Sequence, residues 1–248
     1  MSNHSLKADS ITVEFAGLRA LDHVSLTVNR REILGLIGPN GSGKTTLINV
    51  LTGHVKPVSG TVHCDGEDIG VLLPRKRALR GILRSFQTVR LFSNLTVEEN
   101  IEVASVAKGA SRREAGMVVD RLLEEFSLTA YRTELASSLN YGDERRVEIA
   151  RALAAEPKYL LLDEPAAGMN EEESASLMHI LARLPQERDL GIVIIDHDMP
   201  LIMRLCHRLQ ALAQGKTIGE GGVDEVRSLP AVIEAYLGTD ALEAENHA

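Results

Sequence analysis

Residues 38–45 read Gly38-Pro39-Asn40-Gly41-Ser42-Gly43-Lys44-Thr45, which is the pattern G-x-x-x-x-G-K-[ST]. A short apolar run (32–37) precedes this stretch, and a helix-like run (46–52) follows it and stops before Gly53. A strand, a glycine loop and a helix in this order form the context in which the pattern binds phosphate. The glycines let successive backbone N–H groups face one anion, and the helix N-terminus adds the positive end of its dipole. The stretch therefore predicts a nucleoside triphosphate site.

Individual residues near the loop have expected roles. The Lys44 ammonium can reach the β- and γ-phosphates, the Thr45 hydroxyl can ligate Mg²⁺, and Thr46 is expected nearest the α-phosphate. Phe15, one of only four phenylalanines, lies upstream of the loop. It is either a core aromatic or a platform that stacks on the adenine ring, and the nearby loop favours the platform.

Net charge, cysteine spacing and the length of apolar stretches limit the classes of protein to which this chain can belong. The 248 residues carry a net charge of −8, which argues against nucleic acid held on a broad basic face. Cys64 and Cys206 lie far apart without metal or redox spacing, so we expect buried free thiols in a reducing compartment. No apolar stretch approaches the roughly 18 residues of a membrane span. We therefore expect a cytoplasmic protein that meets a membrane only through partner subunits.

Hydrophobic patterning predicts an α/β fold with inserted helices. The runs 11–15 and 24–28 alternate apolar and polar residues, as expected for an antiparallel pair of strands. The runs 159–163 and 191–195 are continuously apolar, as in parallel strands buried on both faces. Between these regions, 87–156 predicts a helical block. We therefore divide the chain into an α/β nucleotide-binding core (1–86 and 157–248) and a helical subdomain (87–156).

Helix signals refine this division. A capping box of Thr96 and Glu99 begins the helical block, which continues through 117–126 and a helix at 143–155. Another helix over 171–184 is expected to stop at Pro185, because proline lacks the N–H that a helix needs.

A basic helix is expected over 74–81, and it carries Arg75, Lys76, Arg77 and Arg80. We interpret these charges as a solvated face. Contact with phosphates or with an acidic partner surface is the alternative.

Polar residues gather where the buried strands end. Asp163 and Glu164 follow one strand, His197 follows another, and Gln87 follows a third strand-like run at 82–86. The carboxyl ends of such strands line the ligand crevice of an open α/β sheet. A strand-terminal aspartate such as Asp163 holds Mg²⁺ in P-loop proteins, and Glu164 can accept a proton from an attacking water.

The order of these motifs resembles the ATP-binding subunits of ABC transporters over nearly the whole chain. The matching segments are Walker A (38–45), the Q-loop glutamine Gln87, the signature Leu139-Asn140-Tyr141-Gly142-Asp143, Walker B (159–163) and the switch histidine His197. Phe15 matches the adenine-stacking aromatic of the family. The resemblance implies a P-loop ABC ATPase core with an antiparallel β subdomain and the helical subdomain described above.

Within that family, the sequence resembles the branched-chain (hydrophobic) amino acid uptake branch. The stretches 84–92, 140–153 and 163–170 carry this resemblance. It implies an ATP-hydrolysing importer subunit. Uptake of another small solute, such as urea, an amide or an aromatic acid, is the alternative, as is a non-transport ATP-dependent regulatory module.

The resemblance also assigns roles to the signature. Asn140, Tyr141 and Gly142 are expected to face the γ-phosphate held by a second ATPase subunit in a head-to-tail dimer. Asn140 replaces the usual serine but keeps an amide donor, and Asp143 replaces glutamine and can cap the helix. Asn170 stands where the D-loop more often has aspartate. These departures bear on the hydrolysis rate more than on binding.

The implied cofactors are ATP and Mg²⁺, with Gln87 and Asp163 near the metal, Glu164 polarising water and His197 sensing the γ-phosphate. The implied partners are transmembrane permease subunits, which would contact the segment after Gln87 (Arg90, Leu91 and Phe92). A second ATPase subunit, which is either the same chain or a sister subunit, is another implied partner. An extracytoplasmic solute-binding protein is an indirect one. We expect the assembly on the inner face of the cell membrane.

Three rival functions fit the sequence less well. A soluble ABC ATPase of ribosomes or DNA usually has two cassettes in one chain or a coiled-coil insertion, and this chain has neither. A non-hydrolysing module would not need Glu164 and His197. A P-loop kinase or GTPase would have no use for the signature.

Overall fold

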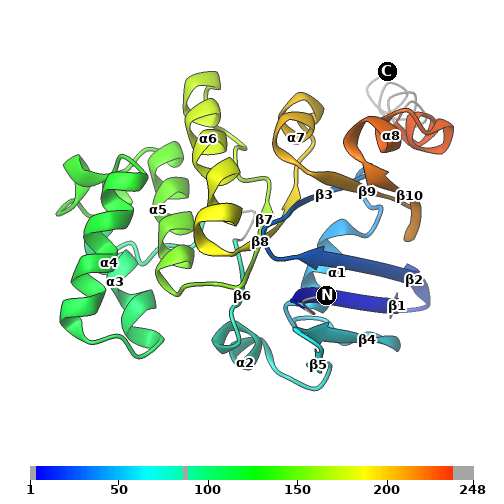
Figure 1. Cartoon of the computed structure of the whole chain (residues 1–248), viewed down its shortest axis with the longest axis horizontal. Coiled ribbons are helices and arrows are strands. Elements are labelled where there is room, and N and C mark those ends of the chain that lie inside the picture. The colour runs from blue at the N-terminus through cyan, green and yellow to red at the C-terminus, as the bar shows by residue number, and fades with distance from the viewer. Residues whose placement is uncertain (1–3, 86–88, 237–248) are drawn as a thin grey trace.

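The computed structural model describes residues 4–85 and 89–236 and contains two β-sheets (Figure 1). A four-stranded antiparallel sheet has the order β2-β1-β4-β5, and a six-stranded sheet has the order β10-β9-β3-β8-β7-β6. The first consists of β1 (Ser5–Phe15), β2 (Leu18–Asn29), β4 (Ser59–Cys64) and β5 (Glu67–Asp68). The second consists of β3 (Ile33–Ile37), β6 (Ile82–Arg84), β7 (Tyr159–Asp163), β8 (Gly191–Ile195), β9 (Arg208–Ala213) and β10 (Lys216–Gly222).

The predicted parallel strands form the centre of the larger sheet. β3, β8, β7 and β6 run parallel, and all five residues of β3, β7 and β8 are buried. Successive side chains of a strand point to opposite faces, so each strand contributes to two cores. Leu160 and Ile194 pack on one face with α6 (Glu171–Arg188) and α7 (Met199–Leu205). Leu161 and Val193 pack on the other face with α1 (Lys44–Leu51) and the antiparallel sheet. The continuous apolar runs are thereby explained.

The antiparallel pair is also confirmed, although both strands are longer than predicted. Both cysteines are buried free thiols, as expected. The final hairpin of β9 and β10 is followed by α8 (Val223–Arg227) and by helical residues 230–236.

Three helices gather at one side of Figure 1, away from the antiparallel sheet. They are α3 (Val97–Ala107), α4 (Arg112–Glu125) and α5 (Tyr141–Ala154). The Thr96–Glu99 capping box that begins α3 is confirmed, and Ser111 and Glu114 form a second box at α4. These helices correspond to the predicted helical subdomain, whose boundaries stay a prediction. Among the described residues, no helix has the length and apolar character to cross a membrane.

Helix α2 (Pro74–Leu79) confirms the predicted solvated face for Arg75 and Lys76, which are exposed, as is Arg80 just after the helix, but not for Arg77. Arg77 is only 2% exposed, and its guanidinium donates to the carbonyls of Val50 and Leu51 at 2.6 and 2.9 Å. Those carbonyls lie at the end of α1, where a helix runs out of N–H partners, and the Val50 carbonyl also accepts a hydrogen bond from the Gly53 N–H at 3.1 Å. Arg77 therefore serves as a structural cap for the helix that follows the phosphate loop.

The prediction that the 171–184 helix stops at Pro185 is wrong. Pro185 lies inside α6, which continues to Arg188 and ends at Asp189 in a left-handed conformation. An internal proline removes a helix hydrogen bond at a cost of about 3 kcal/mol. Leu184 and Pro185 are buried in the core, so packing offsets that cost.

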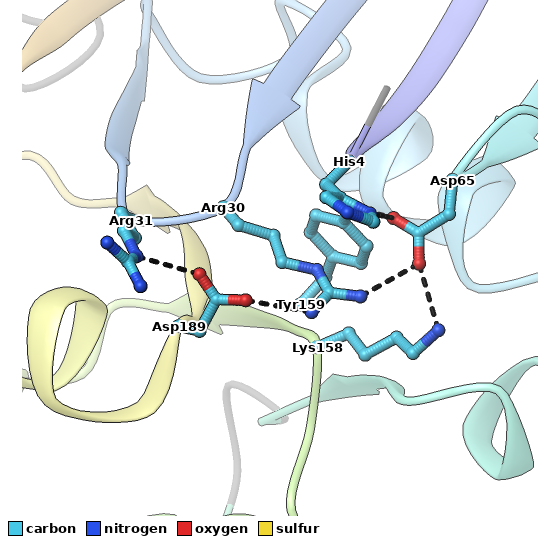
Figure 2. Close-up of polar contacts among 7 residues, drawn as sticks. All are labelled: His4, Arg30, Arg31, Asp65, Lys158, Tyr159 and Asp189. Atoms are coloured by element: carbon cyan, nitrogen blue, oxygen red, sulfur yellow. Dashed lines mark hydrogen bonds and ion pairs between the residues drawn. The ribbon is translucent and has the colours of Figure 1, made fainter. Parts of the chain in front are cut away.

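A polar network joins the two sheets, and Figure 2 shows its residues. The Asp65 carboxylate accepts hydrogen bonds from Tyr159 Oη at 2.6 Å, Lys158 Nζ at 2.9 Å and Arg30 Nη2 at 3.0 Å. Arg30 also donates to Asp189 at 3.0 Å, so the end of α6 belongs to the same network. The network thus ties the β4–β5 turn to the start of β7 and to α6.

The charge of Asp65 depends on these donors. Burial by itself raises the pKa of the Asp65 carboxyl, but the hydrogen bonds from Tyr159, Lys158 and Arg30 lower it to about 2. A depressed carboxyl pKa contributes stability that is fully present above the ordinary value near 3.8 and is lost as the pH falls toward 2.

We expect Asp65→Asn to lower the free energy of unfolding by roughly 2–3 kcal/mol at pH 7, because charged hydrogen bonds are lost. Asn tolerates the left-handed backbone at this position (φ 50°), so the turn is preserved. Urea unfolding measured from pH 7 to pH 2 checks this, and the difference from wild type should shrink below about pH 4. A difference that is independent of pH would contradict the network's role.

Candidate functional site

The predicted site residues meet at one edge of the six-stranded sheet. β3 leads into the phosphate loop, β7 ends at Asp163 and Glu164, and β8 leads into Asp196 and His197. β3, β8 and β7 are parallel neighbours, so their carboxyl ends meet at one edge. Gln87 lies outside the described residues, and its assigned role stays a prediction.

The phosphate loop needs glycine at specific positions for steric reasons. Gly38 and Gly43 have φ angles of 143° and 106°, which side chains rarely allow. A Cβ on Gly38 would lie 2.1 Å from the Leu212 carbonyl oxygen, and one on Gly43 would lie 2.6 Å from Leu21 Cδ2. The loop therefore packs closely between β9 and β2. Gly41 at its crest is exposed, with open space above it.

Lys44 and Thr45 begin α1, two residues earlier than predicted. Lys44 Nζ donates to the carbonyls of Gly38 and Pro39 at 2.6 and 2.9 Å. Burial lowers the pKa of the Lys44 ammonium, while the charges of Asp163 and Glu164 oppose this shift. Thr45 is exposed at the first turn. The first turn thus presents an ammonium, a hydroxyl and free backbone N–H groups to an anion.

Asp163 has the chemistry of a magnesium ligand. Its side chain is buried, and burial raises the pKa of the carboxyl, which Arg84 lowers and Glu164 raises further. A buried carboxylate beside another carboxylate is stabilised by a nearby cation. Magnesium prefers oxygen ligands and commonly uses one or two carboxylates together with phosphate oxygens. Asp163 and the Thr45 hydroxyl therefore fit a Mg²⁺ ion bound with a nucleotide.

Glu164 and His197 lie close together. His197 Nδ1 is 3.8 Å from a carboxylate oxygen of Glu164 and 3.8 Å from one of Asp196, and the His197 ring is 78% exposed. Glu164 is partly buried, and its backbone has a left-handed φ of 48°. A carboxylate and an exposed imidazole thus flank the space beyond the ends of β7 and β8.

Three supporting residues were not among the predicted site residues. Asp196 is buried beneath His197, accepts a hydrogen bond from the Asp198 N–H at 3.0 Å, and has its pKa raised by burial. Ser85 Oγ accepts the Asp163 N–H at 3.2 Å. Tyr236 Oη accepts the Gly38 N–H at 2.8 Å. Of these three, only Asp196 could have been found from a local sequence pattern, because it lies between the end of a strand and a histidine. The contacts of Ser85 and Tyr236 join segments that are far apart in the sequence.

The signature helix differs from its prediction. α5 begins at Tyr141 instead of residue 143, and Asn140 is its N-cap, with Oδ1 accepting the Asp143 N–H at 2.9 Å. The Asn140 amide donates to the Asp143 carboxylate at 2.8 Å. Asp143 therefore orients the cap instead of forming it. Tyr141 and Gly142 lie in the first turn, where helix N–H groups lack partners within the helix. Tyr141 is exposed, whereas Gly142 is buried beside the Glu173 carboxylate.

Phe15 is 49% exposed at the end of β1, so the alternative of a core aromatic is wrong. Stacking on adenine stays a prediction. Phe92 is also exposed, while Leu91 is partly buried.

The cap geometry predicts how the signature tolerates substitution. Asn140→Ala should lower the free energy of unfolding by roughly 1 kcal/mol, because it removes the cap, whereas Asn140→Ser should keep most of that stability. Urea denaturation of the three proteins measures the difference. Equal stability of the alanine and serine variants would contradict the capping role.

Comparison with known proteins places this geometry in a family. A family model described as ABC transporter matches residues 21–167. The chain is 39% identical over 253 residues to the high-affinity branched-chain amino acid transport ATP-binding protein BraF of Pseudomonas aeruginosa, covering 96% of this chain and 99% of BraF. It is 39% identical over 234 residues to the lipopolysaccharide export system ATP-binding protein LptB of Haemophilus influenzae, covering 94% and 97%.

Solved structures agree with the fold. MJ1267, an ATP-binding cassette of an ABC transporter solved in its ADP conformation, is 32% identical with a TM-score of 0.83, covering 94% of this chain and 98% of MJ1267. The dimeric post-hydrolysis state of the cassette MJ0796, bound to ADP and Pi, is 26% identical with a TM-score of 0.79, covering 88% and 98%. The chain belongs to the ABC transporter family.

Proposed function

We propose that this chain is the ATP-hydrolysing subunit of an ABC importer for branched-chain or related hydrophobic amino acids. The observation that carries the proposal is the meeting of the phosphate loop, Asp163, Glu164 and His197 at one sheet edge. The near full-length relationship to BraF supports the solute class. Uptake of another small solute, such as urea, an amide or an aromatic acid, and a regulatory ATP-dependent module remain the alternatives.

Lipopolysaccharide export is a second candidate, because LptB is as similar in sequence as BraF. Uptake of labelled leucine by cells that carry this chain with its permease subunits separates import from export.

In the proposed mechanism, the loop amides and Lys44 bind the phosphates of ATP. Mg²⁺, held by Thr45, Asp163 and the predicted ligand Gln87, would neutralise charge that develops on the phosphates. Glu164 would accept a proton as water attacks the γ-phosphorus and the bond to the ADP oxygen breaks, giving ADP and phosphate. His197, close to Glu164, would contact the γ-phosphate and register its loss.

A second ATPase subunit completes the proposed site. Helix α5 begins at an exposed surface, and its N-terminus is a favourable place for an anion. In a head-to-tail dimer, Asn140, Tyr141 and Gly142 of each chain would face the γ-phosphate bound by the other. The dimeric structure of the related cassette MJ0796, bound to ADP and Pi, supports a dimer.

We expect Glu164→Gln to double the solution mass from 27.0 kDa when Mg-ATP is added, because bound ATP would no longer be hydrolysed. Phosphate release should fall roughly 100-fold or more, as expected for loss of a general base. Light scattering and a phosphate assay measure both effects. Glu124→Gln, on the exposed side of α4, is the matched control. A variant that hydrolyses ATP normally would contradict the role of Glu164, and a persistent monomer would contradict a homodimer.

A groove supports contact with a permease. It has a volume of about 780 Å³, and its apolar wall includes Leu79, Phe92 and Val103, which are all exposed. Arg90, Leu91 and Phe92 line this groove, and they are the residues that we assign to the permease contact. Arg151 stacks on Phe92 with its guanidinium carbon 5.5 Å from the ring centre, which holds the aromatic at the rim.

The charge of this groove is opposite to that of the whole protein. Its lining holds the bases Arg75, Arg84, Arg90, Lys108 and Arg151 and a single acid, Glu148, whereas the protein has a net charge of −8. We therefore propose that it receives an amphipathic cytoplasmic segment of a permease subunit that carries acidic residues. This contact would hold the chain on the inner face of the membrane, with the solute-binding protein as an indirect partner.

Val103→Asp should abolish copurification with the permease subunits while ATP binding is retained, because a carboxylate is placed on the apolar wall of the groove. Met117→Asp is the matched control, since Met117 is an exposed apolar residue of α4 outside the groove lining. Equal copurification of both variants would show that the permease binds elsewhere.

A further inference from the structure

We propose that Arg145 is a positioning residue for Glu164 and that it connects the signature helix α5 to the catalytic turn after β7. The proposal rests on the proposed function, in which Glu164 activates water. It assigns Arg145 no contact with ATP. Its action is to hold the backbone that aims the Glu164 carboxylate.

The contacts of Arg145 join two segments that are far apart in the sequence. The Arg145 side chain is fully buried, and its Nη2 donates to the backbone carbonyls of Asp163 at 2.7 Å and Glu164 at 2.8 Å. Its Nη1 donates to the carboxylate of Glu148, one turn along α5, at 2.6 Å. One guanidinium therefore fixes both carbonyls of the Asp163–Glu164 pair to helix α5.

Burying the Arg145–Glu148 ion pair costs desolvation free energy. Other contacts of the pair must offset this cost. Two buried charges lose hydration, and a well-packed apolar pair of similar size is often as stable or more stable. The planar guanidinium, however, offers several donors in a fixed geometry. Here that geometry spans two consecutive carbonyls that project where β7 ends, a task that an apolar side chain cannot perform.

The turn that Arg145 holds is under backbone strain. Glu164 has a φ of 48°, which is uncommon and unfavourable for a residue with a side chain. The Glu164 N–H donates to the Ile195 carbonyl at 2.8 Å, and its own carbonyl also accepts the Ala167 N–H at 3.2 Å. Arg145 therefore closes a set of bonds that keeps Glu164 in this conformation, with its carboxylate near His197.

This contact has a consequence for the proposed dimer. The signature at the start of α5 would face the nucleotide of the partner subunit, whereas Glu164 serves the nucleotide bound by its own chain. Arg145 lies five residues after Asn140, on the same rigid helix. A shift of α5 on contact with the partner's nucleotide would therefore move the turn that carries Glu164, so that the two sites are coupled.

Two variants test the proposal without leaving a buried charge alone. Arg145→Lys keeps the pair with Glu148, but one ammonium cannot reproduce the bidentate geometry across two carbonyls. The double variant Arg145→Gln/Glu148→Gln replaces the ion pair by amides. We expect kcat for ATP hydrolysis to fall roughly 10- to 100-fold in both, because small misplacement of a catalytic group slows the reaction strongly. The Kd of a fluorescent ATP analogue should stay within about threefold of wild type, since the phosphate loop is untouched.

Hydrogen exchange provides a readout that does not depend on activity. Amide exchange of Glu164, Ala166 and Ala167 should become faster in both variants, while exchange of the phosphate loop stays unchanged. Arg132→Lys is the matched control, because Arg132 forms two ion pairs on the surface of the helical subdomain, with Glu98 and Asp120. It should leave both exchange and kcat as in wild type.

The outcomes separate this proposal from the proposed function. Unchanged exchange at the amides of Glu164, Ala166 and Ala167, or kcat and ATP affinity that fall together with thermal stability, would overturn the positioning role of Arg145. Absence of ATP hydrolysis by the wild-type chain with its permease subunits would instead overturn the proposed function. Even in that case, faster amide exchange confined to the turn in the Arg145 variants would support the role of Arg145 in holding the turn.

Discussion

Parallel pairing of β3, β8 and β7 is the constraint on which the rest of the structure depends. It brings the phosphate loop, the Asp163–Glu164 pair and His197 to one edge, although about 160 residues separate the first from the last. The pairing is stable because apolar layers cover both faces of these strands. Polar groups that would be costly inside the sheet collect where the strands end, and a charged ligand can be bound there.

The buried and partly buried charges divide into two kinds. Asp163 and Asp196 are buried carboxylates whose pKa values are raised by burial, which suits groups that meet a cation or support a histidine. Asp65 is held by three donors that keep its pKa low, and Arg145 is paired with Glu148. The first kind lies at the edge of the sheet where the strands end, and the second kind holds segments in place around it.

Errors in the sequence predictions have a common physical cause. The helix through Pro185 and the burial of Arg77 both follow from contacts with segments far away in the chain. Predictions from local sequence consider the hydrogen bond that proline removes from a helix and the preference of arginine for water. They do not account for the apolar core against α6 or for the helix-terminal carbonyls of α1 that accept hydrogen bonds from Arg77.

The sequence by itself determined the glycine loop, the buried strands, the helices that follow Thr96 and the polar residues that follow the strands. Each of these depends on local spacing, hydrophobic periodicity or backbone geometry, which a short window of residues contains. Only the tertiary structure decided that Tyr236 contacts Gly38, that Asp65 joins the two sheets and that Arg145 holds the Glu164 turn. Those contacts link residues that no local pattern relates, because the folded chain brings them together through the packing of whole elements.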